Sequence, residues 1–203
     1  MKTRKITCLA LCLILILLPA CAEKLTGPEV PSNWPEYRMK DLTLRWEAGW
    51  TEEEPADFEA EALEGFDALS ITPKAAWIGV LASPSGSTRE RNYLTVSRFA
   101  AGEKVTPELL EQYKSQLGDL KVAFLQAGVG VAVVDEPQVE KIWDMPVLTF
   151  SCRMTMADET KVLVQTAIVG RDEMIYQIHF MDYLSNSSDG SIRLLVSGLK
   201  WPE

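Results

Sequence analysis

The pattern of apolar and polar residues begins with a segment unlike the rest of the chain. Residues 6–18 form an apolar run, broken only by one threonine and two cysteines, and Lys2, Arg4 and Lys5 precede it. A basic start, a short apolar run and small residues at its end are typical of an export signal. The run is shorter than the roughly 20 residues that a helix needs to span a bilayer. Residues 1–20 are therefore predicted to be a signal peptide.

The next segment, residues 21–36, has no apolar period. It contains Pro28, Pro31 and Pro35 among small polar residues, with Trp34 as the one large apolar side chain that could pack on a domain. Proline-rich segments are extended, at about 3.1 Å per residue. The segment is therefore predicted to be a tether that holds the following domain about 45 Å from its anchor.

Alternation of apolar and polar residues then predicts several strands in residues 37–203. The expected strands are 39–46, 66–71, 92–99, 129–134, 146–156, 161–169 and 174–183. Between the first two lies an acidic stretch, residues 52–64, in which part is expected to be a short surface helix. The tight connections between the last three strands predict an antiparallel meander.

Two helices are predicted among these strands. In the longer one, Thr106 is a suitable N-cap and Pro107 a suitable first residue, an apolar stripe runs through 109–127, and Gly128 is a natural stop. A short helix is expected near the end, over residues 192–199. The fold class is therefore predicted to be α+β, one domain in which an antiparallel β-sheet is packed with helices.

The end of the apolar run carries a short motif. Leu18-Pro19-Ala20-Cys21 resembles the lipobox of bacterial lipoproteins, although Pro19 departs from the residues usual at that position. The resemblance implies cleavage before Cys21, attachment of a diacylglycerol to its thiol and usually acylation of the new amino terminus. The alternative is an ordinary secretory signal cleaved after Ala22, because Ala20-Cys21-Ala22 is itself an A-x-A site.

Residues 66–201 resemble the Mog1/PsbP-like family. The likeness rests on Ser70-Ile71 followed by Pro73 and Trp77, on the position of the long helix between early strands and a late meander, and on the final strand 175–180 before a terminal helix. The resemblance implies an α/β/α sandwich. It also implies an accessory or binding protein, because the family shares no catalytic residues that could be transferred to this sequence.

The net charge of the chain makes some classes of binding partner unfavourable. The formal net charge is -9, and removal of the three basic residues of the signal leaves -12 on the mature chain. Such a surface repels nucleic acid, whose affinity for proteins comes largely from Lys and Arg contacts to phosphate. It also repels anionic lipid, so a membrane partner would have to be reached through the lipid on Cys21.

Metal and nucleotide cofactors are not expected. The chain has one histidine, and Cys152 is the only cysteine left once the signal is removed and Cys21 is lipidated, so no His/Cys zinc set exists. No Asp-rich calcium loop is present. The acidic stretch is interpreted as a solvated surface. Gly128-Val129-Gly130 lacks the rest of a phosphate-binding loop and is not expected to bind nucleotides.

Catalysis would have to use His179, the only imidazole. On alternation, Cys152 lies on an apolar strand face, while His179 points away from the apolar face of its own strand. If both apolar faces line one core, the two side chains project to opposite sides of the sheet and cannot meet. No catalytic residue is therefore predicted and the protein is not expected to be an enzyme. An envelope hydrolase or other enzyme that uses His179 is the alternative.

The tryptophans suggest where binding occurs. Trp46, Trp77 and Trp143 lie in apolar contexts and are predicted to be core residues, whereas Trp34 and Trp50 flank irregular segments and could line a groove. The overall prediction is a non-catalytic lipoprotein of the cell envelope that binds a protein partner or a small ligand, with a purely structural role as a further alternative. In a two-membrane host, Ala22 after the lipidated cysteine favours the outer membrane, facing the periplasm.

Overall fold

The computed structural model describes residues 27–54, 75–84, 91–126, 130–155, 159–183 and 191–202, without the side chains of 118–126 and 131–135. The predicted signal peptide, the lipid site Cys21, most of the acidic stretch and the predicted strand 66–71 lie outside these residues. Within them, no helix is both long enough and apolar enough to cross a bilayer.

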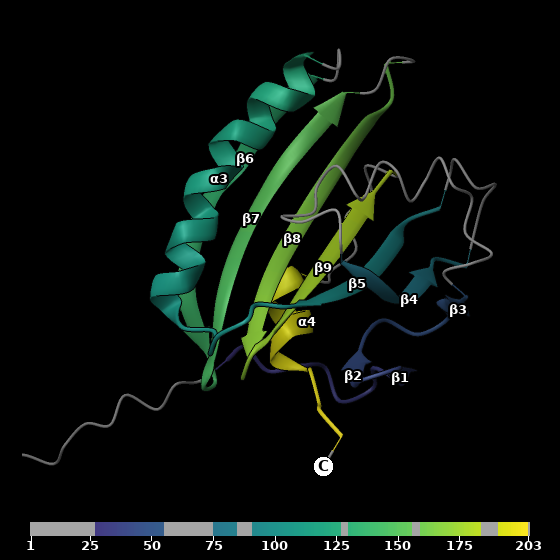
Figure 1. Ribbon diagram of the computed structural model, residues 1–203. Coiled ribbons are helices and arrows are strands. Elements are labelled where there is room, and N and C mark those ends of the chain that lie inside the picture. Colours follow the sequence, from purple (N-terminus) through teal and green to yellow (C-terminus); the bar gives the residue numbers. More distant parts are fainter. Residues whose placement is uncertain are drawn as a thin grey trace, which may run out of the picture.

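A seven-stranded sheet forms the centre of the domain (Figure 1). Its spatial order is β3-β4-β5-β9-β8-β7-β6, and every neighbouring pair is antiparallel. The strands are β3 (Thr51–Glu53), β4 (Ala76–Ala82), β5 (Tyr93–Ala100), β6 (Gly130–Ile142), β7 (Met145–Thr155), β8 (Lys161–Arg171) and β9 (Met174–Asp182). The predicted late meander is confirmed, and β6 is much longer than expected because it continues beyond Pro137 at the sheet edge.

The predicted strand 39–46 is wrong in its detail. The chain forms a separate hairpin instead, with strands β1 (Glu36–Met39) and β2 (Leu42–Arg45) joined by a turn at Lys40-Asp41. Apolar residues occur on both sides of this turn, Met39 before it and Leu42 and Leu44 after it, which is why one strand was expected. A backbone bridge between Thr43 and Lys200 attaches the hairpin to the C-terminal segment.

Two helices are described, both in predicted positions. The long helix α3 (Pro107–Gln126) begins after Thr106, whose Oγ1 accepts a hydrogen bond of 3.3 Å from the Leu109 N–H. It lies along β6 and β7 (Figure 1). The short helix α4 (Ile192–Ser197) begins at Ser191, whose side chain accepts a hydrogen bond from the Leu194 N–H.

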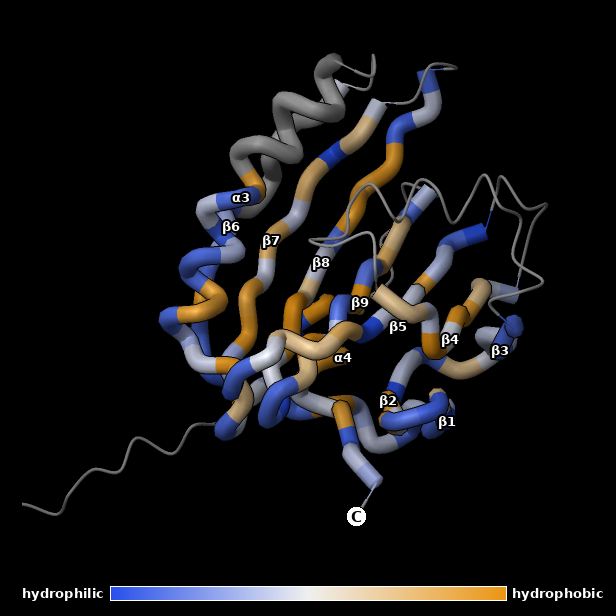
Figure 2. The backbone as a smooth tube through the Cα atoms, viewed as in Figure 1, coloured by the Kyte–Doolittle hydropathy of each residue, from blue (hydrophilic) through white to orange (hydrophobic). Residues whose placement is uncertain are grey.

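The sheet is apolar on both faces. One face, here called the hairpin face, packs against β1, β2 and α4, and Ile178 and Phe180 belong to it. The other, the helix face, packs in part against α3, and Leu148 and Ile175 belong to it. Hydrophobic residues recur along β7 and β8, interspersed with polar ones (Figure 2). The fold is α+β, but helical layers on both faces are not evident in the described chain, because a hairpin covers much of one face.

Residues 27–35 pack against the domain, so the prediction that residues 21–36 form an extended tether is wrong for this part of the segment. The Arg45 guanidinium donates hydrogen bonds to the backbone carbonyls of Pro31, Ser32 and Trp34, at 2.9–3.3 Å. The Trp34 ring meets the Trp46 ring edge-on, with 5.3 Å between centroids. The prolines therefore shape a segment that lies against the domain. An extended linker of fifteen residues does not fit these contacts.

Candidate functional site

The structure overturns the predicted arrangement of Cys152 and His179. Cross-strand partners project to the same side of a sheet, and Cys152 pairs with Val164, while His179 pairs with Thr166, two residues further along β8. Both side chains therefore lie on the helix face. The prediction was wrong because both faces of the sheet are apolar, so the apolar faces of two strands do not have to be the same face.

The two residues still do not form a catalytic pair. Strand β8 separates β7 from β9, so their backbones are about 10 Å apart, given about 4.8 Å between neighbouring strands. A base must lie within about 3 Å of the proton that it removes. His179 is fully buried, and its Nδ1 lies 3.0 Å from Thr166 Oγ1. The side of β9 that carries His179 is therefore buried and not solvated.

Burial sets the protonation of both groups. It lowers the pKa of His179 to about 4 and raises the pKa of the Cys152 thiol to about 11. At neutral pH the imidazole is uncharged and the thiol holds its proton. A protonated, buried thiol is a poor nucleophile, which gives these side chains the character of core residues.

The tryptophans differ from their predicted roles. Trp46 is fully buried, as predicted, and Trp34 and Trp50 pack on it; neither lines the two pockets described below. Trp143, predicted to lie in the core, is 45% exposed. Trp77, also predicted to be core, is half-buried at the edge of the sheet.

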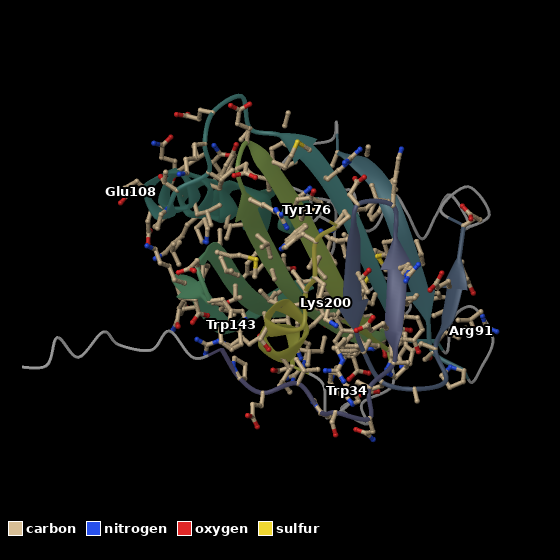
Figure 3. The ribbon with its side chains drawn as sticks, turned by 90° about the horizontal axis from the view of Figure 1, so that it is seen from below. Trp34, Arg91, Glu108, Trp143, Tyr176 and Lys200 are labelled. Atoms are coloured by element: carbon tan, nitrogen blue, oxygen red, sulfur yellow. The ribbon has the colours of Figure 1, made fainter. Side chains whose placement is uncertain are left out.

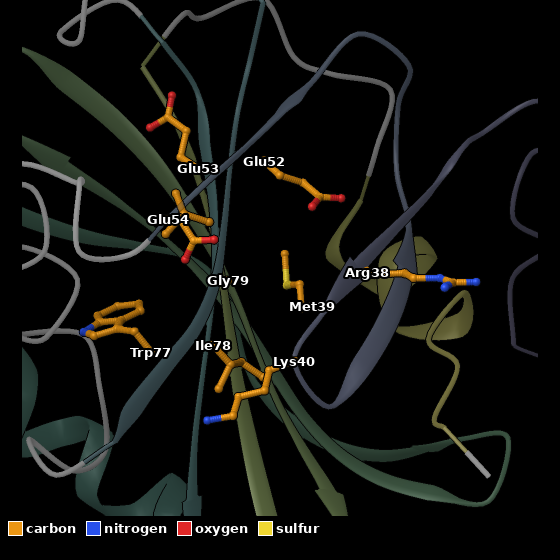
Figure 4. A pocket seen from close by; sticks show the side chains of 10 residues that line it. Arg38, Met39, Lys40, Glu52, Glu53, Glu54, Trp77, Ile78 and Gly79 are labelled. Carbon is orange, nitrogen blue, oxygen red and sulfur yellow. The ribbon is translucent and has the colours of Figure 1, made fainter.

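A pocket of about 380 Å³ lies at this edge, between the β1–β2 hairpin and strands β3 and β4 (Figure 4). We call it the edge groove. Its lining residues are Arg38, Met39, Lys40, Glu52, Glu53, Glu54, Trp77, Ile78, Gly79 and Val80. In the close view Met39 lies at the centre, with Trp77 and Lys40 to one side and Arg38 and Glu52 to the other.

Two local features build the edge groove. Strand β3 is short and pairs only with Val80–Ala82, so within the described chain the first half of β4 has a strand partner on one side only. A register shift between Trp77 and Gly79 bends β4 at this point. Gly79 also lets the hairpin approach, because a Cβ there would lie 2.4 Å from Met39 Sδ. The result is a bent strand edge next to a methionine.

The edge groove carries both signs of charge. Arg38 and Lys40 come from the hairpin, and three consecutive glutamates come from β3 and the residue after it. Glu53 is already engaged, since its Oε1 accepts a hydrogen bond of 3.0 Å from Arg91 Nη1. An extended segment can bind along such an edge through its backbone, with neighbouring side chains selecting its sequence.

A second hollow, of about 280 Å³, lies between strands β6, β7 and β8 and the start of α4. It is lined by polar groups, including Gln138, Thr149 and Ser151. The Gln165 side chain in its wall already accepts a hydrogen bond from the Ile192 N–H, at 2.9 Å. Of the two hollows, the edge groove has the richer set of charged and apolar groups. No group of metal-binding side chains occurs in the described chain.

Comparison with known proteins identifies the fold alone. No family model matches the chain, and no curated protein matches it either. The solution structure of cyanobacterial PsbP (CyanoP) from Synechocystis sp. PCC 6803 is similar, with a TM-score of 0.55 and 9% identity over 91% of this chain and 99% of that one. The predicted PsbP-like domain is therefore supported as a fold.

A second similar structure is a protein from Bacteroides thetaiotaomicron, with a TM-score of 0.49 and 12% identity. The match covers 80% of this chain but only 45% of that protein, so the chain spans less than half of its length.

The edge groove was missed in the sequence because its parts are far apart in it. Residues 38–40, 52–54 and 77–80 meet only through the hairpin turn and the sheet register. One signal was available: Gly79 interrupts the apolar run of β4, and an isolated glycine in a strand often marks a bulge or a close backbone approach.

Proposed function

We propose that the protein is a lipid-anchored, extracytoplasmic binding protein of the cell envelope, and that it binds an extended segment of a protein partner in the edge groove. The observation that supports this most is the groove itself, where a half-covered strand edge adjoins Trp77, Met39 and both signs of charge. A small apolar ligand fits it less well, because such sites are usually enclosed and lined mainly by apolar groups.

A non-catalytic role agrees with the state of the only imidazole. His179 is neutral and fully buried at neutral pH, away from the edge groove. An envelope hydrolase would need this ring to reach a substrate. At 9% identity, the likeness to the PsbP structure carries no argument about activity. Complementation of a deletion strain with His179→Gln tests whether the ring is needed for function.

The anchor is tested at Cys21. We expect Cys21→Ala to abolish incorporation of labelled fatty acid and to leave unprocessed precursor, because the lipobox chemistry proceeds through that thiol. The measurement is metabolic labelling followed by mass determination of the amino terminus. Wild-type protein without lipid whose first residue is Glu23 would instead establish the ordinary secretory signal.

The edge groove is tested by reversing one charge. Lys40 is exposed in the hairpin turn, so Lys40→Glu should change the free energy of unfolding by no more than about 0.5 kcal/mol. It replaces one of the two cations that line the groove with a carboxylate, which changes the charge pattern that the partner meets and should weaken its binding. We expect a deletion strain complemented with this variant to keep the null phenotype.

Lys161→Glu is the matched control. Lys161 is an exposed lysine at the start of β8 and does not line the edge groove, so this variant has the same charge change and should complement fully. Equal complementation by the two variants, at equal protein level and melting temperature, would rule out the groove as the binding site.

A further inference from the structure

Trp143 is in an unusual position for a large apolar residue. At 45% exposure it is the only exposed large hydrophobic residue in the described part of the chain. It lies in the turn between β6 and β7, with φ at 53°. Bulky residues rarely adopt positive φ, and the strain is on the order of 1 kcal/mol. Glycine or asparagine would adopt this backbone conformation with less strain. The presence of a large, exposed indole here therefore suggests a role for the side chain.

One edge of the Trp143 indole contacts the N-terminal segment and the end of α4. Trp143 Nε1 donates a hydrogen bond of 3.0 Å to the Ser197 carbonyl, and the ring lies so close to Gly27 that a Cβ there would be 3.1 Å from Cε2. The Ser197 hydroxyl also donates a 2.6 Å hydrogen bond to the Pro28 carbonyl. The N-terminal segment therefore meets the domain at Trp143 and the end of α4 (Figure 3).

The proposed lipid is close to this point. Gly27 is six positions after Cys21 in the chain, so even a fully extended chain reaches about 20 Å. Because residues 27–35 lie on the domain, they add no further reach. The end of the domain that carries Trp143 must then stay within about 20 Å of the lipid, less than half of the distance predicted for a free tether.

The chemistry around Trp143 suits a bilayer surface. Tryptophan is enriched where an apolar ring meets water at a membrane interface. The mature chain is strongly acidic, but the charges in this region are mixed: Lys141 and Arg193 lie here with Glu29, Glu140 and Asp144, and Arg193 is paired with Glu140. A single ring is enough, because a short anchor keeps it at high local concentration next to the bilayer.

We infer that the exposed face of Trp143 rests in the interfacial layer of a phospholipid bilayer and sets the orientation of the domain on it. This inference rests on the proposed lipid anchor.

The test uses the mature, lipidated protein in vesicles of phosphatidylethanolamine and phosphatidylglycerol, with part of the lipid brominated near the interfacial end of the acyl chains. Bromine quenches tryptophan emission at short range. We expect brominated vesicles to reduce the emission of the wild-type protein, and Trp143→Phe to abolish that reduction. Trp201→Phe is the matched control, because Trp201 is also partly exposed but packs at a tilt against Tyr176, with 4.6 Å between ring centroids.

The outcomes separate the two proposals. Wild-type protein that fails to co-float with vesicles would refute the lipid anchor, and this inference with it. Protein that co-floats but shows no bromine-dependent loss of emission, or the same loss in Trp143→Phe, would refute the docking of Trp143 while leaving the anchor intact. Loss of quenching in Trp143→Phe but not in Trp201→Phe supports the docked orientation.

Discussion

Replacement of Trp46 by alanine is expected to lower the free energy of unfolding by about 3–5 kcal/mol, the range measured when large buried aromatic residues are truncated. Trp46 is fully buried at the centre of an aromatic cluster. Its ring centroid lies 5.3 Å from Trp34, 5.8 Å from Trp50 and 5.3 Å from Phe180. It therefore connects the N-terminal segment to β9 in the middle of the sheet, and its loss should also loosen that segment.

Urea unfolding followed by circular dichroism measures this effect. Trp201→Ala is the control, since Trp201 is partly exposed, packs at a tilt against Tyr176 and lies beneath the Arg171 guanidinium, 4.8 Å from it. We expect that variant to lose only about 1 kcal/mol, typical of an exposed cation–π contact with partial burial. A loss of less than about 2 kcal/mol in Trp46→Ala would mean that the cluster can collapse into the space.

The second large effect is a loss of stability in mild acid. Burial lowers the pKa of His179 in the folded protein to about 4, against an ordinary value of 6.5. Between these values the unfolded chain binds a proton that the folded chain does not, so the free energy of unfolding falls as the pH falls. The effect is absent above about pH 6.5 and complete near pH 4. At 1.36 kcal/mol per pKa unit it reaches about 3 kcal/mol.

His179→Gln isolates this contribution. His179 is the only histidine in the chain, and the carboxylates titrate in both proteins. Urea unfolding at a series of pH values from 7 to 4 should show a smaller decrease in the variant than in the wild type, by about 3 kcal/mol. Parallel curves would show that water reaches the ring. A folded, correctly anchored His179→Gln protein that fails to complement a deletion strain would favour the envelope hydrolase over the binding protein.

Local signals in the sequence predicted most elements of the fold. Thr106, Pro107 and the apolar stripe located α3, and the tight turns located the meander of β7, β8 and β9. These features depend on neighbouring residues. The β1–β2 hairpin was missed because Lys40-Asp41 is an ordinary polar pair whose role as a turn is fixed by packing of Leu42 and Leu44 in the core.

The site was less predictable because it depends on pairing between distant strands. The faces on which Cys152 and His179 lie follow from the register between β7, β8 and β9. Alternation within a single strand does not reveal that register. Trp143 looked like a core residue because Ile142 and Met145 flank it, yet they pair with each other and leave the indole in the turn. Likewise, the proline-rich segment became ordered because Arg45 binds its carbonyl groups.

The pairing of β5 with β9 has a consequence for the order of folding. Ser97 lies opposite Gln177, eighty residues later, and β3, β4 and β5 join the rest of the sheet only through this pair of strands. Contacts between such distant residues form slowly, because a long loop must close first. The first half of the sheet therefore stays incomplete until β9 has emerged. For a chain proposed to be exported, this delay would keep the sheet open until almost all of the polypeptide has been synthesised.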